Sequence, residues 1–257
     1  MANVILLAYT PNPEYTVASA AKLCYSSSTI TGLMDNLTDE KAASFVDMLS
    51  EIGHESPIEH ASFTFGIEGV SRSLLAQITR HRMASFSVKS QRYVREGSFE
   101  YVTPPEIAAD PEAKKLYDEI MAADQEKYDR IAEILKEKHI KTFLAEGKDE
   151  KTAARLAEKK AIEDARFVLP NSCETQMVMT VNARSLKNFF RIRCCKRAQW
   201  EIQDVANQML ALVSKVAPNL FKNAGPACLN GACSEGKMSC GKPEEVRRFY
   251  KELKNNG

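Results

Sequence analysis

The sequence predicts a soluble globular protein that combines half-buried strands with long amphipathic helices, as one large domain or a domain with an appendage. Its 257 residues can bury a substantial core, and 44% hydrophobic with 27% charged residues is ordinary for a soluble chain. Residues 61–70 and 174–182 alternate apolar and polar side chains, as half-buried strands do. Over residues 110–140 and 202–216, apolar side chains instead recur three and four positions apart, which predicts helices.

The first half of the chain alternates short elements with turn signals. Thr38 precedes a helical pattern, and Gly53 stands where a left-handed residue would end that helix. Phe63, Phe65 and Ile67 share the buried face of the strand that follows. The expected elements, in order, are a first strand or buried edge over residues 1–9, a turn at 11–13, a helix over 16–25, a loop over 26–31, a helix from 38 to 53, a strand over 61–70 and a helix that begins at Ser71.

The second half is dominated by helices. Asp110 suits an N-cap and Pro111 a first helical position, so a long helix begins there. Its expected buried stripe is Leu116, Ile120, Tyr128, Ile131 and Leu135. The remaining expected elements are a helix from about 149 to 169, a strand over 174–182, a helix capped by Ser185, a helix from about 199 that Pro218 ends, a loop beyond Phe221 and a charged helix from Pro243.

Charge and targeting signals restrict the class of protein. The formal net charge is +1, whereas nucleic-acid binders that act without sequence preference carry a domain-wide excess of Lys and Arg. No segment approaches the apolar run needed to cross a bilayer, and the N-terminus lacks a basic leader. We therefore expect a cytoplasmic protein that binds neither nucleic acid nor membranes.

The seven cysteines do not predict a disulfide framework, because their number is odd and a cytosolic chain of this size does not need one. Cys228, Cys233 and Cys240 could join Cys194 or Cys195 around a metal, but their spacing contains no Cys-x-x-Cys pair. We expect reduced thiols and no metal.

Two basic stretches indicate anion binding. Residues 80–93 contain three arginines, a lysine, a histidine and three serines, with no carboxylate. The guanidinium fork stays protonated and suits phosphate oxygens, although a solvated basic loop is the alternative. The second stretch, residues 182–193, carries Arg184 at the start of a helix, where phosphates bind readily. No dinucleotide fingerprint or P-loop occurs, so two such stretches suit a nucleotide substrate together with a nucleotide cofactor.

Two histidines near residue 57 do not form a zinc helix. His54 and His60 are six apart with Pro57 between them, whereas a zinc helix needs histidines four apart on one face. His54 follows a helix end, so it is either a polar residue that faces a ligand or a satisfied loop histidine.

The motifs resemble those of the flavin-dependent thymidylate synthases (ThyX). Arg80-His81-Arg82, seven residues and then Ser90 is similar to the signature of that family. Residues 53–60 (GHESPIEH), 181–189 (VNARSLKNF) and 197–202 (RAQWEI) also resemble its blocks, in the same order. The resemblance covers about residues 15–220 and implies an α+β fold with a central antiparallel sheet flanked by helices and additional long amphipathic helices.

The resemblance also implies an assembly and a reaction. It implies a homotetramer with active sites between subunits, which converts dUMP to dTMP. Methylenetetrahydrofolate is the one-carbon donor, reduced FAD supplies the hydride and NADPH regenerates the flavin. The catalytic domain would span residues 1–221, and residues 222–257 form a Cys-containing tail of unknown role.

Site residues follow from the same resemblance, position by position. The implied dUMP contacts are Gln77, Arg80, Ser90, Arg92, Arg166 and Arg193. The implied FAD contacts are Ser56, Arg80, His81, Arg82, Asn182, Arg184 and Asn188, with His54 near the flavin. Arg193, His54 and Ser90 are the catalytic candidates. Some family members carry an acidic residue where this chain has Val88, so any contact there must come from the main chain.

We assign no cysteine as the nucleophile of the reaction. Arg193 stays cationic and can stabilise an electron-rich uracil, so no enzyme nucleophile is needed. Ser90 is the competing nucleophile, but an unassisted serine is weak, and phosphate binding suits it better. A flavin- or nucleotide-binding protein without methyl transfer and a nucleic-acid binder are the alternative functions.

Overall fold

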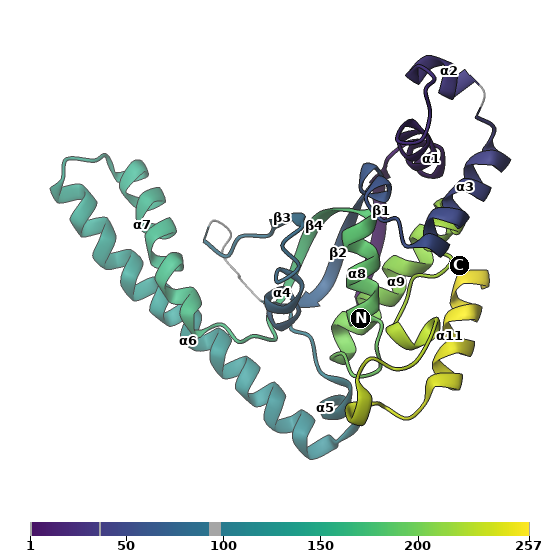
Figure 1. Ribbon diagram of the computed structural model, residues 1–257. Coiled ribbons are helices and arrows are strands. Elements are labelled where there is room, and N and C mark those ends of the chain that lie inside the picture. Colours follow the sequence, from purple (N-terminus) through teal and green to yellow (C-terminus); the bar gives the residue numbers. More distant parts are fainter. Residues whose placement is uncertain (1, 36, 93–98, 257) are drawn as a thin grey trace. The chain divides into compact units, whose positions relative to one another are not determined.

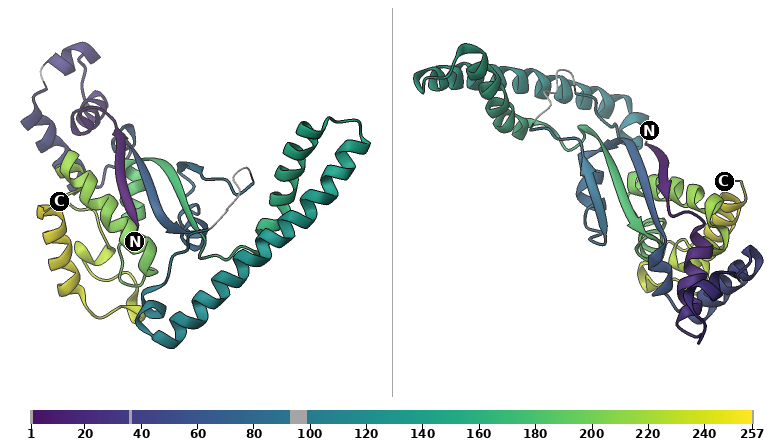
Figure 2. Two further views of the ribbon diagram at one scale, coloured as in Figure 1. Left: turned by 180° about the vertical axis from the view of Figure 1, so that it is seen from behind. Right: turned by 90° about the horizontal axis from the view of Figure 1, so that it is seen from above.

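A computed structural model describes residues 2–35, 37–92 and 99–256, and they divide into two compact units (Figures 1 and 2). The sheet unit comprises residues 2–68, 76–87 and 177–257, and the hairpin unit comprises residues 69–75 and 88–176. Tyr93, the last residue of the basic stretch 80–93, lies outside the described residues.

The chain is rich in helices, and all of the expected strands are present. The strands are β1 (Asn3–Tyr9), β2 (Ser62–Ser71), β3 (Ala84–Val88) and β4 (Glu174–Asn182). The α-helices are α1 (Pro13–Leu23), α2 (Ile30–Asp35), α3 (Asp39–Ile52), α4 (Arg72–Ile78), α5 (Pro105–Ala109), α6 (Pro111–Ala145), α7 (Glu150–Ala165), α8 (Ala183–Arg193), α9 (Trp200–Val216), α10 (Pro218–Phe221) and α11 (Pro243–Asn256). The 3₁₀ turns are η1 (Pro57–His60), η2 (Arg166–Val168), η3 (Ala227–Leu229) and η4 (Gly236–Met238).

The four strands form one antiparallel sheet in the order β1-β2-β4-β3, which confirms the α+β class. β1 pairs with β2 from Asn3 opposite Glu68, and the register shifts between Leu6 and Ala8. The expectation of a buried edge is wrong for most of β1. Only Val4 is buried, and the apolar side chains of Ile5, Leu7 and Tyr9 are 44 to 53% exposed. β1 is therefore an edge strand with an uncovered apolar row.

The core of the sheet unit lies between the sheet and helices α8 and α9. Alternation places Phe63, Phe65 and Ile67 of β2 and Met177, Met179 and Val181 of β4 on the buried face. Phe190 of α8 packs edge to face against Phe221, which also contacts Phe63. Gln208 of α9 accepts a hydrogen bond from the Val4 amide and donates one to the Ala2 carbonyl, so α9 also holds β1.

Local capping fixes where the helices begin and end. Thr38 caps α3, and Gly53 ends it with φ of 70°, both as the sequence indicates. Ser185 is wrong as the cap of α8, because the Oδ1 atom of Asn182 accepts the Ser185 amide at 2.9 Å. β4 thus runs directly into α8, and the helix begins two residues before Ser185. The six-residue helix α2 replaces part of the expected loop and has no buried residue to reveal it.

The hairpin unit is built around the antiparallel pair α6 and α7, which Figure 2 shows side by side. Asp110 caps α6 as expected, accepting the amides of Glu112 and Ala113. Buried alanines every fourth residue of α7, Ala153, Ala157, Ala161 and Ala165, allow the two helices to approach closely.

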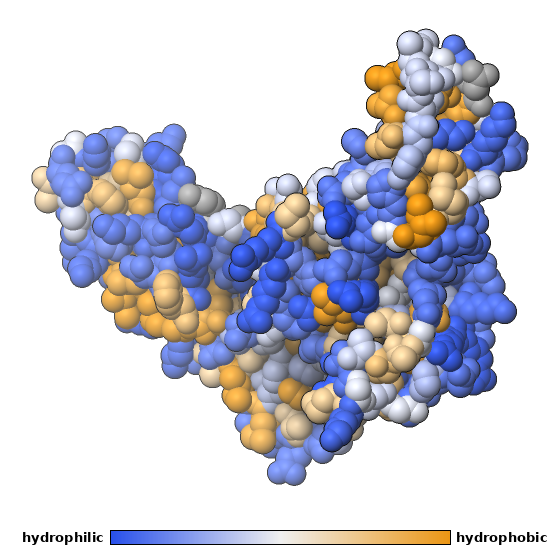
Figure 3. Space-filling model, in the orientation of Figure 1, coloured by the Kyte–Doolittle hydropathy of each residue, from blue (hydrophilic) through white to orange (hydrophobic). Residues whose placement is uncertain are grey.

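The expected buried stripe of α6 is only partly correct. Tyr128 is fully buried, but Leu116 and Ile120 are each 55% exposed. Figure 3 shows apolar surface along this helix among hydrophilic side chains.

Candidate active site

The sheet unit contains a cavity of about 1220 Å³ beside α8. Small-molecule pockets are usually about 300–1000 Å³, so this one is large enough for an extended ligand. Its walls come from the segment after α4, the end of β4, one face of α8, two glutamates near η1 and a stretch of the tail at residues 223–230. Residues 80–83 of the first basic stretch and residues of the second therefore meet at one cavity, although the two stretches are a hundred residues apart.

The cavity has an excess of positive charge. Six cationic side chains line it, against two carboxylates from Glu55 and Glu59. The cations are Arg80, Arg82, Arg184, Lys187, Arg191 and Arg193. An excess of this kind in a concave site attracts and holds anions such as phosphates. The cavity thus suits a phosphorylated ligand, and the arginine forks offer bidentate binding.

Arg193 is held at the cavity by neutral partners. Its Nε donates to the Nε2 of His81 at 3.1 Å, and one terminal nitrogen lies 3.5 Å from the Gln77 carbonyl oxygen. Burial, and then the charge of Arg80, lower the pKa of the Arg193 guanidinium. The guanidinium is therefore oriented without being neutralised, and a bound anion would relieve its repulsion with Arg80.

His81 has the protonation state that this contact requires. Burial, and then the nearby charge of Arg193, lower the pKa of His81, so the ring is neutral at pH 7. Since Nε2 accepts from Arg193, the ring proton sits on Nδ1. The ring also packs edge to face against Phe189, with centroids 4.8 Å apart. His81 thus orients Arg193 without adding or cancelling charge.

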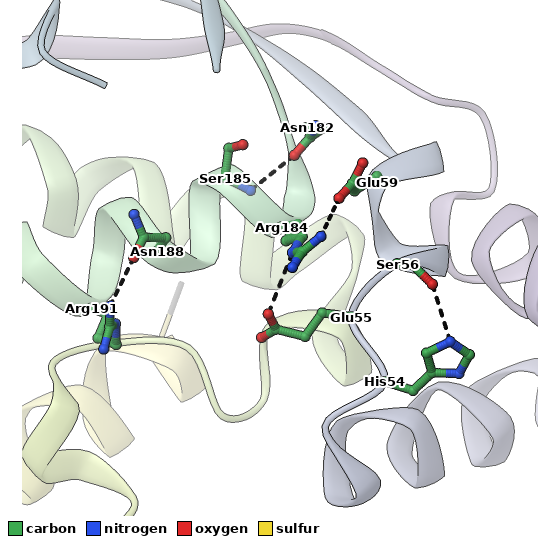
Figure 4. A network of polar contacts seen from close by, with 9 residues as sticks. All are labelled: His54, Glu55, Ser56, Glu59, Asn182, Arg184, Ser185, Asn188 and Arg191. Atoms are coloured by element: carbon green, nitrogen blue, oxygen red, sulfur yellow. Dashed lines mark hydrogen bonds and ion pairs between the residues drawn. The ribbon is translucent and has the colours of Figure 1, made fainter. Parts of the chain in front are cut away.

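Arg184, at the opposite end of α8, has charged partners. It lies 2.5 Å from Glu59 and 3.5 Å from Glu55. Figure 4 marks both ion pairs with dashed lines. These carboxylates, with the hydrogen bond to Glu59 as the largest cause, raise the pKa of Arg184. Most of the Arg184 charge is therefore already balanced within the chain.

The side of α8 that lines the cavity also presents the amide groups of Asn182 and Asn188 and the amine of Lys187. The Oδ1 of Asn188 accepts from Arg191 at 3.1 Å, and the Asn182 oxygen caps the helix, as Figure 4 shows. Both amides keep an NH₂ group to donate. Burial lowers the pKa of Lys187, which also lines the cavity. Lys187 is not among the contacts that the sequence predicts, although it lies within the motif VNARSLKNF.

His54 and Ser56 form a smaller local network. The Nε2 of His54 lies 3.1 Å from the Ser56 hydroxyl, and its Nδ1 lies 3.0 Å from the Tyr25 hydroxyl. Neither His54 nor Ser56 is among the described residues that line the cavity. The left-handed Gly53 turns the chain at the end of α3 and so sets the position of His54.

The remaining predicted dUMP contacts gather in the hairpin unit. The Ser90 hydroxyl accepts the amide of Arg92 at 3.2 Å, and Arg92 pairs with Glu163 at 2.7 Å. Arg166 donates to the backbone carbonyl of Glu163 at 3.1 Å. Ser90, Arg92 and Arg166 thus form one local group, while Gln77, Arg80 and Arg193 form another in the sheet unit.

The cysteines show neither disulfides nor a metal site in the part of the chain that the structure describes. Burial raises the pKa of the Cys194 thiol to about 12, and burial and then the neighbouring Cys233 raise that of Cys228. Cys195, Cys228 and Cys233 line a smaller cavity of about 370 Å³. Among the described residues that line the larger cavity, none is a cysteine.

Comparison with known proteins matches the chain along nearly its whole length. The profile of the Thy1 family, described as "Thymidylate synthase complementing protein", matches residues 5–219. The flavin-dependent thymidylate synthase of Clostridium tetani is 56% identical over 247 residues, which are 96% of each chain. Those of Geobacter sulfurreducens and Pyrococcus horikoshii are 44% and 35% identical, over 97% and 98% of this chain and 98% of each relative.

Among the described helices, none is long and apolar enough to span a bilayer.

Proposed function

Because the chain belongs to the flavin-dependent thymidylate synthase family, we propose that it catalyses reductive methylation of dUMP to dTMP. Methylenetetrahydrofolate would be the one-carbon donor, and NADPH the reductant that regenerates reduced FAD. The observation that carries the proposal is the cation-rich cavity in which Arg193 is held by uncharged partners. Such a site can bind an anionic nucleotide and still act on charge that develops during reaction.

The residues around the cavity fit a flavin nucleotide. The predicted contacts Arg80, His81, Arg82, Asn182, Arg184 and Asn188 all line it, and Ser56 lies close by in sequence to Glu55 and Glu59 of its wall. Arginine forks suit a diphosphate, and amide NH₂ groups can donate to ring carbonyls or ribose hydroxyls. Bound reduced FAD would supply the hydride.

The substrate would be held by two sets of groups. We propose Gln77, Arg80 and Arg193 in the sheet unit, and Ser90, Arg92 and Arg166 in the hairpin unit, as the contacts of dUMP. A serine hydroxyl with arginine forks is a suitable phosphate-binding set. The proposed homotetramer has active sites between subunits, so both sets need to be considered in the assembled enzyme.

In the chemical step, Arg193 would stabilise negative charge on the uracil. Its guanidinium remains protonated and is oriented by His81, so the ring carbon can become nucleophilic without a covalent bond to the enzyme. A cysteine is a poor alternative, because the buried Cys194 next to Arg193 has its pKa raised to about 12. His54 would lie near the flavin, and Ser90 would bind phosphate rather than attack the substrate.

We also propose how the subunits assemble and where in the cell the protein lies. A homotetramer would cover the apolar row of Ile5, Leu7 and Tyr9 on edge strand β1, which is exposed in the single chain. We assign the catalytic domain to residues 1–221 and a cytoplasmic location, with no nucleic-acid or membrane partner. No structural metal is proposed.

The test is direct. The purified protein should show a flavin absorbance spectrum, and it should form dTMP only when dUMP, methylenetetrahydrofolate and NADPH are all present. Product would be followed by chromatography of the nucleotides. A protein that carries flavin but forms no dTMP under these conditions would be a flavin-binding protein without methyl transfer, and the proposed function would be wrong.

A further inference from the structure

The tail, residues 222–257, contributes a wall to the larger cavity, which we propose as the flavin site. Residues Asn223 to Ala227 and Asn230 line it, although the family profile ends at residue 219. This stretch is the first part of the tail whose role the sequence left open. Its cavity wall is made of small side chains, with Ala224, Gly225 and Pro226 all buried. The tail therefore adds small, mostly apolar groups to a cavity that the arginines of α8 also line.

The path of this wall is fixed by Gly225. Its φ of 140° is one that residues with a side chain rarely adopt, and an added Cβ would lie 3.0 Å from Leu229 and 3.9 Å from the ring of Tyr250. Asn230 donates to the Asn223 carbonyl at 2.7 Å and closes the stretch into a compact turn. A side chain at position 225 would therefore strain the backbone of the wall and require the Leu229 side chain to shift.

Helix α11 holds this stretch of the tail in place through hydrogen bonds to its backbone. Arg247 donates from Nε to the Cys228 carbonyl at 3.1 Å, and from a terminal nitrogen to the Gly231 carbonyl at 3.0 Å. One guanidinium thus holds two backbone carbonyls of a segment whose described secondary structure consists of the short 3₁₀ turns η3 and η4. The Tyr250 hydroxyl lies 2.6 Å from both the Cys194 carbonyl and Asn207 Oδ1, which ties α11 to the C-terminal end of α8 and to the middle of α9.

We infer that residues 223–230 form one wall of the flavin site and that Arg247 is the residue that positions this wall. A wall of small, mostly apolar side chains can lie against the face of a planar ring, while the arginines that line the same cavity suit the phosphates of the same ligand. The inference rests on the proposed function, since it takes FAD as the ligand. Arg247 does not line the cavity itself, so it acts only through the backbone it holds.

The first test compares two neighbouring arginines of α11. Arg247→Ala should weaken FAD binding to the full-length protein at least about tenfold, measured by flavin fluorescence titration. Arg248→Ala is the matched control, because Arg248 is exposed and lines another pocket, and its FAD affinity should stay within about twofold. Arg247→Lys keeps the charge but cannot hold both carbonyls in the same fork, so it should restore affinity only in part.

The second test uses two glycines of the tail. Gly225→Ala should weaken FAD binding by a similar factor, whereas Gly231→Ala should not, because a Cβ at 231 meets nothing within 4 Å. All titrations are made well below the melting temperature of each variant, so a loss of stability alone would not change the affinity. Wild-type affinity in both Arg247→Ala and Gly225→Ala would overturn the inference. A wild-type protein that binds no FAD would overturn the proposed function and the inference with it.

Discussion

The two ends of helix α8 use the same residue in different ways. At the N-terminal end, Arg184 lies between Glu55 and Glu59, and its pKa is raised by them. At the C-terminal end, Arg193 contacts the neutral His81 ring and a backbone carbonyl, and burial lowers its pKa. One arginine is balanced within the chain, and the other keeps its charge for a ligand.

The difference shows that the groups an arginine contacts, rather than its being an arginine, indicate whether it can stabilise negative charge on a ligand. An arginine paired with carboxylates must give up those contacts before it can stabilise a new anion. An arginine held by neutral acceptors is already oriented and loses nothing when negative charge develops beside it. Arg92 in the hairpin unit follows the first pattern, because it pairs with Glu163.

The largest effect on activity should come from Arg193, at the C-terminal end of α8, where no carboxylate of the described residues balances the charge. Arg193→Ala is expected to lower dTMP formation by about a hundredfold or more, as for the loss of a preorganised charge at a developing anion. Activity would be measured at saturating dUMP so that weaker binding does not dominate. Arg155→Ala, on the exposed face of α7, is a control that should leave the rate unchanged. Equal losses in both variants would mean that the effect is unspecific.

A smaller effect is expected from Arg184, at the N-terminal end of α8, where Glu55 and Glu59 balance the charge. Arg184→Ala should weaken FAD binding by roughly tenfold, because it removes a cation and leaves two carboxylates facing the ligand. Conversely, Glu59→Gln would make Arg184 resemble Arg193 and should tighten FAD binding by roughly two- to fivefold at low salt. If Glu59→Gln weakened binding instead, Glu59 would be a ligand contact, and the contrast between the two ends would be wrong.

The pH dependence of stability should report on His81. Because its pKa is lowered in the folded protein, the unfolded chain takes up the proton first as the pH falls below about 6.5. The free energy of unfolding should therefore decrease from about pH 6.5 downward, and His81→Gln should reduce that slope. His139 also has a pKa lowered by burial, but it is present in both proteins, so the difference isolates His81. Denaturant titrations at several pH values would measure it, and identical slopes would contradict the neutral state of His81.

The smallest effect is expected at the cysteines. Cys195→Ser should leave dTMP formation within about twofold, because Cys195 faces the smaller cavity and the proposed reaction uses no thiol nucleophile. Cys24→Ser, at an exposed position, is the matched control. A hundredfold loss in Cys195→Ser alone, with FAD binding intact, would show that a thiol takes part.

The sequence predicts those parts of the fold that depend on local patterns. The alternation of Phe63, Phe65 and Ile67 and the caps Thr38 and Gly53 are visible in the chain, and the structure confirms them. The cap of α8 is not decided locally, since Asn182 and Ser185 are both good cap residues and only the end of β4 selects Asn182. Leu116 and Ile120 follow a helical stripe, but both stay 55% exposed in the part of the chain that the structure describes.

The sequence predicts which charged residues belong to the site, but it does not predict which side chains contact each of them. Arg184 and Arg193 both stand out as basic residues of one motif region. Nothing in the sequence shows that Glu55 and Glu59 reach one of them and His81 the other, because these contacts span more than a hundred residues. The same holds for the tail, where the contribution of Gly225 to the cavity depends on the packing of α11 behind it.

Chemical rescue of Arg193→Ala tests the central claim most directly. With FAD and dUMP saturating, dTMP formation would be measured in this variant with and without added guanidinium, and with ammonium at the same concentration. We predict a rate at least about a hundredfold below wild type, partly restored by guanidinium and much less by ammonium, because the planar fork is what the site lacks. A variant that forms dTMP within about twofold of the wild-type rate would contradict the account.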